Sequence, residues 1–230
     1  INPSSGQVVF STLIGGSSLD LPRAMEIDAS GNIYICGYTS SVNFPVTAGA
    51  YQTASGGNYD VFVLKVNPSG SSLLASTLLG ATASDIGTSI AIASDGSAVV
   101  GGQTASASFP TTAGAYDRVF NGFGDDDDAF LAKLNSNFSQ LVYSTFLGGT
   151  SREKINCLAL DSDGKPVVAG FTYSAQFPTS AGAFQTTFGG GVSDVFVTKF
   201  NSNASSIEFS TFVGGGMSEE ASAIVLDASN

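Results

Sequence analysis

One segment recurs along the chain, and the spacing of its copies constrains the fold more than any other feature. The segment reads Phe-Pro, two further residues, then Ala-Gly-Ala and an aromatic residue, and it begins at Phe44, Phe109 and Phe177. The copies are 65 and 68 residues apart. Self-similarity at a nearly constant period indicates a repeat architecture, in which each copy is one supersecondary unit.

Three further landmarks recur in register with the first. Ser-Thr, two apolar residues and a glycine occur four times, ending at Gly15, Gly80, Gly148 and Gly214. A strand-like pattern that runs from aspartate through phenylalanine to lysine begins at Asp60, Asp128 and Asp194. A turn ends at Gly31, Gly96 and Gly164. The period therefore covers the whole chain.

The apolar stretches of each repeat predict strands and not helices. They are short, rich in β-branched and aromatic residues, and bounded by Gly, Asn, Asp or Ser. In the best-preserved repeat, strands are predicted near 88–93, 98–103, 128–134 and 141–147. The first strand has one face of large residues and one of small residues, which suits the crowded axis of a propeller. We predict an all-β fold of four-stranded antiparallel β-propeller blades.

The count of predicted strands does not fill whole blades. A fourth strand at 7–14 opens the chain and a first strand at 222–227 closes it, which gives about 3.5 blades. We interpret 1–230 as a single partial propeller with repeats at about 1–21, 22–86, 87–154, 155–220 and 221–230. Since propellers close with about four to eight blades, the ring is incomplete. Missing sequence or a second copy would complete it, whereas end-to-end joining of the half-blades gives an open filament if the rotation does not close. The start at Ile1 indicates a processed product or a fragment.

The motifs together resemble the SBBP family, the seven-bladed β-propeller repeat. The resemblance rests on the run from Tyr143 to Gly149, on Leu158 to Gly164, on the Phe-Pro at Phe177 and on the strand from Asp194 to Lys199. Ala81 departs from the pattern, because the other copies have a second glycine there. The resemblance implies a bacterial or archaeal secreted or cell-surface protein and carries no catalytic residues over to this chain.

An acidic residue recurs between the fourth strand of one blade and the first strand of the next. The four positions are Asp20, Asp85, Glu153 and Glu219. One interpretation is a ring of carboxylates that binds Ca²⁺ through hard oxygen ligands. The alternative, which we favour, is a carboxylate that accepts backbone N–H bonds in a turn or pairs with a recurring lysine. The recurring lysines are Lys65, Lys133 and Lys199.

Asp125, Asp126, Asp127 and Asp128 form the densest run of charge. Their mutual repulsion makes them a second candidate Ca²⁺ site, although the spacing is not that of an EF-hand loop. A solvated loop tip is the alternative. Glu26 is a charge among the small residues of the first strands. It could point into a central channel and coordinate a ligand, but we favour an exposed residue near an incomplete blade. Cys36 and Cys157 replace small residues in strands, which predicts buried free thiols.

The composition argues against several partners and reactions. Lys and Arg total 8 against 19 Asp and Glu, so the formal net charge is −11, and the chain has no histidine. Nucleic acids and anionic membrane surfaces require basic patches, so neither is an expected partner. No apolar run is long enough for membrane insertion. Catalytic motifs of the nucleophile-elbow, phosphate-loop and dinucleotide types are missing, and we do not expect an enzyme or a cofactor.

We therefore expect a non-enzymatic structural or adhesive module that is extracellular or on the cell surface. Its expected partners are other proteins or further copies of the chain, met through the loops and the terminal half-blades. An extracellular glycan is a further candidate partner. One alternative is a hydrolase or lyase that acts on extracellular polysaccharide through Asp and Glu, with its two carboxylates about 5–10 Å apart. The other is a Ca²⁺-stabilised binding module.

Overall fold

The computed structural model describes residues 4–122, 124 and 126–227. In this part of the chain, twelve strands form three separate sheets of four antiparallel strands. The first blade contains β1 (Asp20–Ile27), β2 (Ile33–Thr39), β3 (Asp60–Val66) and β4 (Leu73–Leu79). The middle blade contains β5 (Asp85–Ile92), β6 (Ala98–Thr104), β7 (Asp128–Leu134) and β8 (Leu141–Leu147). The third blade contains β9 (Glu153–Leu160), β10 (Pro166–Thr172), β11 (Asp194–Phe200) and β12 (Ile207–Val213).

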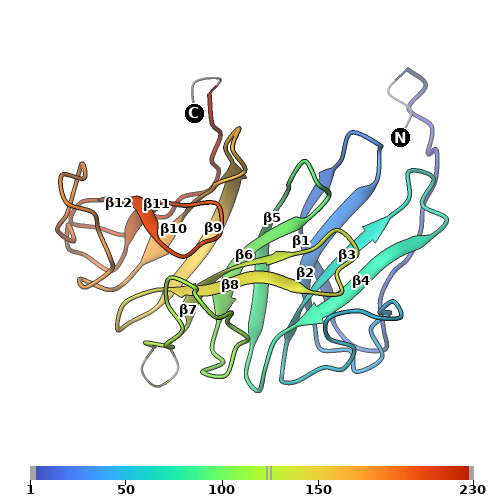
Figure 1. The fold of residues 1–230 in the computed structure, drawn as a ribbon, viewed down its shortest axis with the longest axis horizontal. Helices are drawn as coiled ribbons and strands as arrows, with labels where there is room; N and C mark the ends of the chain where they lie inside the picture. The colour runs from blue at the N-terminus through green and yellow to red at the C-terminus, as the bar shows by residue number, and fades with distance from the viewer. Residues whose placement is uncertain (1–3, 123, 125, 228–230) are drawn as a thin grey trace.

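Each sheet is a meander, because its strands neighbour one another in chain order. Figure 1 shows the three sheets side by side in the order of the sequence. The first strands of successive blades are in contact, β1 with β5 and β5 with β9. The all-β fold and the four-stranded antiparallel blades predicted from the repeat are confirmed, and the three sheets form an incomplete propeller.

The glycine-ended turns join the first two strands of each blade. Gly31, Gly96 and Gly164 have φ values of 79°, 78° and 74°, in the left-handed region that glycine adopts without steric cost. In the first turn, the N–H of Gly31 donates to the carbonyl of Asp28 at 2.9 Å. The recurring glycine is therefore a backbone requirement of the hairpin.

The first strand of the middle blade begins three residues earlier than predicted, at Asp85. The N–H of Asp85 donates to the carbonyl of Tyr59 at 2.8 Å, and Asp85 pairs in register with Thr104 of β6. A β-bulge between Gly87 and Ser89 interrupts the alternation of side chains in this strand. Since the strand prediction relied on alternation, it missed the residues before the bulge.

The half-blade strands predicted at 7–14 and 222–227 do not pair into a sheet. Both segments nevertheless stay beside a blade, because residues 10–14 line a cavity with β1, β2 and β3, and residues 224–226 line one with β9. Ile14 packs against the apolar cluster on the first blade, as Leu79 packs against the middle blade. A strand needs a hydrogen-bonded neighbour, and the described part of the chain offers these segments none.

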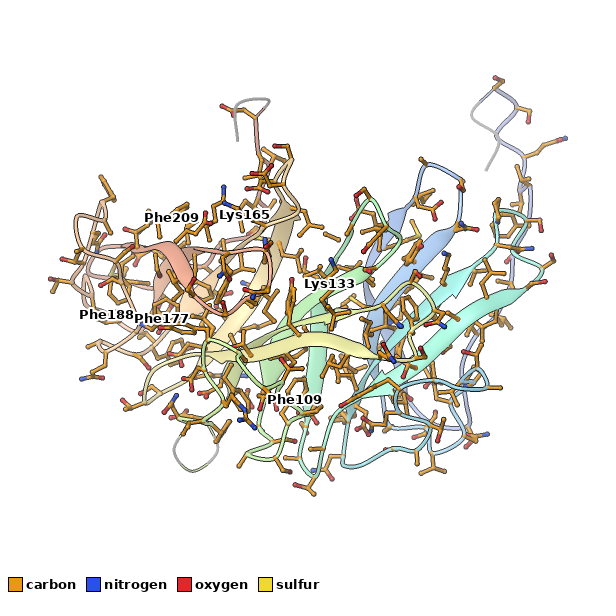
Figure 2. The ribbon with its side chains drawn as sticks, viewed as in Figure 1. Phe109, Lys133, Lys165, Phe177, Phe188 and Phe209 are labelled. Carbon is orange, nitrogen blue, oxygen red and sulfur yellow. The ribbon has the colours of Figure 1, made fainter. Side chains whose placement is uncertain are left out.

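The core lies between the blades. One buried cluster joins the first and middle blades and includes Val61, Val63 and Phe130. A second joins the middle and third blades and includes Leu131 and Phe196. Each Phe-Pro phenylalanine packs on the phenylalanine of the third strand of its own blade, and Figure 2 labels two of them. The ring-centroid distances are 4.7 Å for Phe44 and Phe62, 4.5 Å for Phe109 and Phe130, and 4.5 Å for Phe177 and Phe196.

Candidate functional site

The acidic residues predicted as a ring are bound to the turns that precede them. Asp20, Asp85 and Glu153 are the first residues of β1, β5 and β9, and not loop residues as the sequence suggested. Each carboxylate accepts a bond from the backbone N–H four residues earlier. The pairs are Gly16 with Asp20 at 2.7 Å, Ala81 with Asp85 at 2.7 Å, Gly149 with Glu153 at 2.9 Å and Gly215 with Glu219 at 3.1 Å.

A threonine of the neighbouring strand donates to the other oxygen of the same carboxylates. Thr39 donates to Asp20 at 2.5 Å, Thr172 donates to Glu153 at 2.6 Å, and Thr104 donates to Asp85. These contacts fit the turn-bonded alternative, in which the carboxylate fixes the connection between blades. Ca²⁺ binding by the ring stays a prediction.

The recurring lysines do not pair with this acidic row. Lys199 forms an ion pair at 2.6 Å with Asp161, in the turn between β9 and β10 of its own blade. Lys133 lies 4.0 Å from Asp95 in the equivalent turn, and the Nζ of Lys65 lies 4.9 Å from the centroid of the Tyr34 ring. The lysines therefore stabilise the hairpin ends of the blades.

The structure adds a second row of buried acids that sequence reasoning used only as a landmark. Asp60, Asp128 and Asp194, the first residues of β3, β7 and β11, have no exposed surface. Between the middle and third blades, Asp128 and Glu153 meet at Gly148. A β-carbon on this glycine would lie 2.9 Å from Oδ1 of Asp128 and 2.7 Å from Oε2 of Glu153. The recurring glycine leaves room for a pair of carboxyl groups.

The electrostatics of this pair depart from those of exposed acids. Burial raises the pKa of Asp128 to about 7 and that of Glu153 to about 7. At the preceding junction, burial raises the pKa of Asp85 to about 6, and the neighbouring Asp60 acts in the same direction. Oδ1 of Asp128 is buried without a hydrogen-bond partner. A proton on Oδ1 would turn this unpartnered atom into a donor toward the neighbouring carboxylate.

The aspartate run divides into residues with different surroundings. Asp125 lies outside the described residues. Asp126 is half-buried, whereas Asp127 and Asp128 are buried, so the solvated-tip interpretation is wrong for these two. Oδ2 of Asp127 accepts a bond from Nε2 of Gln103 at 2.5 Å and pairs with Arg152 at 3.3 Å. In the part of the chain that the structure describes, no group of three or more acidic or cysteine side chains is placed to hold a metal ion. Ca²⁺ at the run stays a prediction.

The cysteines agree with the sequence-based interpretation. Cys36 and Cys157 are free and buried, and burial raises the pKa of Cys36 to about 12. A thiol with so high a pKa is protonated at neutral pH and is a poor nucleophile. Glu26 is exposed on β1 and lines a cavity of about 460 Å³ together with residues of β5, β9 and the segment 224–226. The channel-facing alternative for Glu26 therefore has geometric support.

Sequence reasoning missed a cluster of cations. Arg23 on β1 and Arg152 and Lys154 at the start of β9 line one cavity of about 440 Å³. They are three of the eight basic residues in the chain. Their closeness to the recurring acids could have revealed them. Arg23 lies three residues after Asp20, and Arg152 and Lys154 lie directly before and after Glu153.

The comparison with protein families agrees with this geometry. The family model described as a β-propeller repeat, SBBP, matches residues 9–45. This stretch of the chain is therefore similar to one SBBP β-propeller repeat. The matched SBBP segment runs from the first predicted Ser-Thr motif through β1 and β2 to the Phe-Pro at Phe44, and the same landmarks recur in the later blades. A search of curated proteins finds none that matches. The part of the chain that the structure describes includes no helix long and apolar enough to cross a membrane.

Proposed function

We propose that the chain is a non-enzymatic structural or adhesive module, located outside the cell or on its surface, that joins proteins through the two end faces of its blade stack. The supporting observation is that repeat positions buried between blades are exposed at both ends. Large exposed apolar patches on soluble proteins mark interaction sites. The end faces therefore have the chemistry of an interface.

The N-terminal face is the side of the first blade that no complete blade covers. Met25 and Ile27 on β1 are 62% and 57% exposed. At the same repeat position as Met25, Ile90 and Leu158 are 5% and 8% exposed, because each packs at a junction with the preceding blade. An apolar cavity of about 490 Å³ opens on this face, between Met25 and the segment 10–14.

The C-terminal face is the opposite end of the stack, the side of the third blade that no following blade covers. Phe209 and Val213 are 41% and 43% exposed, and Figure 2 labels Phe209. Their counterparts Tyr143 and Leu147 in the middle blade are 3% and 0% exposed and belong to the core at the next junction. Phe184, which follows the third Phe-Pro, is 85% exposed. This face thus presents the half of a junction that the N-terminal face lacks.

The partner that fits both faces is a second copy of this chain, docked head to tail. The third blade of the second copy would pack against the first blade of this chain. The contact would repeat the one that the first blade makes with the middle blade and the middle blade makes with the third. In that arrangement, Phe209 and Val213 of the second copy replace Phe10 and Ile14, which occupy the same repeat positions on the N-terminal face. The segment 7–13 is exposed and unpaired in a sheet, so its displacement costs little.

The experiment measures the mass of the native particle by light scattering over a range of concentrations. We expect the mass to rise with concentration, and we expect Met25→Asp and Phe209→Asp each to remain monomeric, since a buried unpaired carboxylate disfavours the junction. Mixing the two variants restores a dimer, because the mixture contains one intact face of each kind. Val142→Asp is the control, since Val142 lies on the middle blade and is 52% exposed.

Three results would contradict the proposal in different ways. A wild-type chain that stays monomeric at every concentration overturns the second copy as partner. Association that mixing does not restore overturns the head-to-tail order. Detection of the protein only inside its source cells, by antibody against separated medium, surface and cytosol, overturns the location.

The alternatives make other demands on the structure. A polysaccharide hydrolase or lyase needs two carboxylates that face a groove, whereas the acid pair of Asp128 and Glu153 is buried between blades. A Ca²⁺-stabilised module predicts that EDTA lowers the melting temperature. The end faces favour assembly over either alternative.

A further inference from the structure

A second feature, independent of the end faces, points to a ligand. The cavity of about 440 Å³ lies where the starts of β1, β5 and β9 come together with residues 220–222. Its volume is within the range of about 300–1,000 Å³ that is usual for small-molecule sites. Arg23, Arg152 and Lys154 line it together with one acid, Glu220, and the polar side chains of Thr88, Gln103 and Asn156. Three cations thus gather in one cavity of a protein whose net charge is −11.

The charges of these cations are only partly compensated within the chain. Arg152 pairs with Asp127, but its Nε is buried without a hydrogen-bond partner. The ion pairs found among the described residues include neither Arg23 nor Lys154. Arg23 instead lies over the ring of Tyr38, with its Cζ 5.3 Å from the ring centroid. The cavity therefore has positive groups available for an anion.

Electrostatic crowding supports the same conclusion. Burial lowers the pKa of Lys154, and the nearby charges of Arg23 and Arg152 lower it further. Glu220 and Asp127 act in the opposite direction without cancelling the shift. An anion bound between these cations would relieve their mutual repulsion.

We propose that this cavity binds an anionic sugar, that is, a hydroxylated ligand with one carboxylate or phosphate group. A guanidinium presents two parallel N–H groups that match a carboxylate or phosphate, and the lysine adds a point charge. Within the chain, the amide nitrogens of Gln103 and Asn156 donate to Asp127 and to the carbonyl of Ala221, and the hydroxyl of Thr88 donates to backbone carbonyls. The amide oxygens of Gln103 and Asn156 then face the cavity as acceptors for the hydroxyl groups of a sugar. The compact cavity suits a single sugar unit or the end of a chain.

The test is calorimetric titration of the whole chain with four probes: glucuronate, glucose 6-phosphate, glucose and inorganic phosphate. We expect both anionic sugars to bind and glucose to bind at least tenfold more weakly. Arg23→Gln and Lys154→Gln should each weaken the anionic sugars by about tenfold or more, because each removes a charged hydrogen-bond donor. Arg118→Gln, which makes the same change at an exposed position, should leave binding unchanged.

Each contrary result removes a stated part of the proposal. Equal binding of glucose would show that the cations do not recognise the ligand. If inorganic phosphate bound as tightly as glucose 6-phosphate, the sugar part of the ligand would contribute nothing to binding. If none of the four probes gives a heat of binding at millimolar concentration, the proposed binding site is wrong.

Folding and assembly can be separated from this test. Neutralising Lys154 removes one of three crowded like charges, so the melting temperature should not fall. The monomeric variants Met25→Asp and Phe209→Asp should keep the binding constant of the wild type, since neither residue lines the cavity. Failure of the assembly proposal would therefore leave the sugar site standing, and the reverse also holds.

Discussion

At the scale of single residues, the buried pair Asp128 and Glu153 leads us to expect a stability that depends on pH near neutrality. Burial raises the pKa of Asp128 from 3.8 and that of Glu153 from 4.5, both to about 7. The charges of Asp117 and Asp126 act in the same direction. Since two interacting carboxyls titrate as a unit, the pair holds one proton in the folded chain that the unfolded chain has released by about pH 5.

The sign of the pH dependence follows from the raised pKa values. The bound proton stabilises the folded chain fully at any pH below the pKa values that the two acids have in the unfolded chain. This stabilisation is lost as the pH rises through about 7, the pKa of both acids in the folded chain. We expect the urea midpoint at constant ionic strength to fall between pH 5 and pH 8. A midpoint that stays constant or rises over this interval would contradict the raised pKa values, because an acid with a lowered pKa, such as Asp161 beside Lys199, is ionised in both states above pH 5 and adds no slope there.

Amide substitutions at the pair should have opposite effects. In Asp128→Asn, the carbonyl can keep the bond from the N–H of Asn121, at 2.7 Å from Oδ2 in the wild type. The new NH₂ then stands at the unpartnered Oδ1 position and donates to Glu153. We expect urea unfolding at pH 8 to show a gain of about 1 kcal/mol and a weaker pH dependence.

Glu153→Gln is the contrasting variant. Both oxygens of Glu153 accept bonds, from Gly149 and Thr172, so an NH₂ group would face a donor. We expect a loss of about 1–3 kcal/mol across the pH range in the same assay. Equal effects of the two variants would show that the carboxyl groups do not share a proton.

At the scale of elements, the connections between blades depend on the glycine after each Ser-Thr motif. A β-carbon at Gly148 would lie within 3.0 Å of both carboxyl groups at the junction, and the buried β7 and β9 leave little room for a shift. We expect Gly148→Ala to lower the free energy of unfolding by about 1–3 kcal/mol, measured by urea titration. Gly216→Ala is the control, since no atom lies within 4 Å of its β-carbon position. Equal losses would show that the acid pair does not limit this position.

The same elements show how far the sequence could predict the fold. The strands at 128–134 and 141–147 were placed at their observed bounds, because alternation and flanking turn residues are local signals. The segments 7–14 and 222–227 carry the same local pattern but do not pair, since pairing depends on a neighbouring strand. Local pattern therefore predicts which residues can form a strand, and tertiary context decides whether they do.

The candidate sites were harder to predict for a related reason. The rows at Asp85 and Asp60 were each visible as repeats, but their meeting at a glycine between two blades involves residues far apart in sequence. The cations at Arg23 and Lys154 belong to different blades and occupy different repeat positions, three residues after Asp20 and one residue after Glu153. Contacts across blade junctions are set by the stacking of whole sheets, which no single repeat contains.

At the scale of the whole molecule, stability should decrease from the middle blade toward both ends. The middle blade packs against a blade on each side, and every residue of β6 is buried. The first and third blades each have one open face, and the segments 7–13 and 221–227 are not paired in sheets. We expect amide hydrogen exchange at low protein concentration to be slowest in β6 and β7 and fastest in these segments.

The concentration dependence of exchange then tests assembly without any mutation. If a second copy covers the end faces, raising the protein concentration should slow exchange in β1 and β12, while β6 and β7 remain unchanged. The segment 7–13 should stay fast or become faster, because the proposed docking displaces it from the N-terminal face. Slower exchange in 7–13 together with β1 would contradict displacement and would mean that the incoming chain adds strands beside this segment, completing its blade.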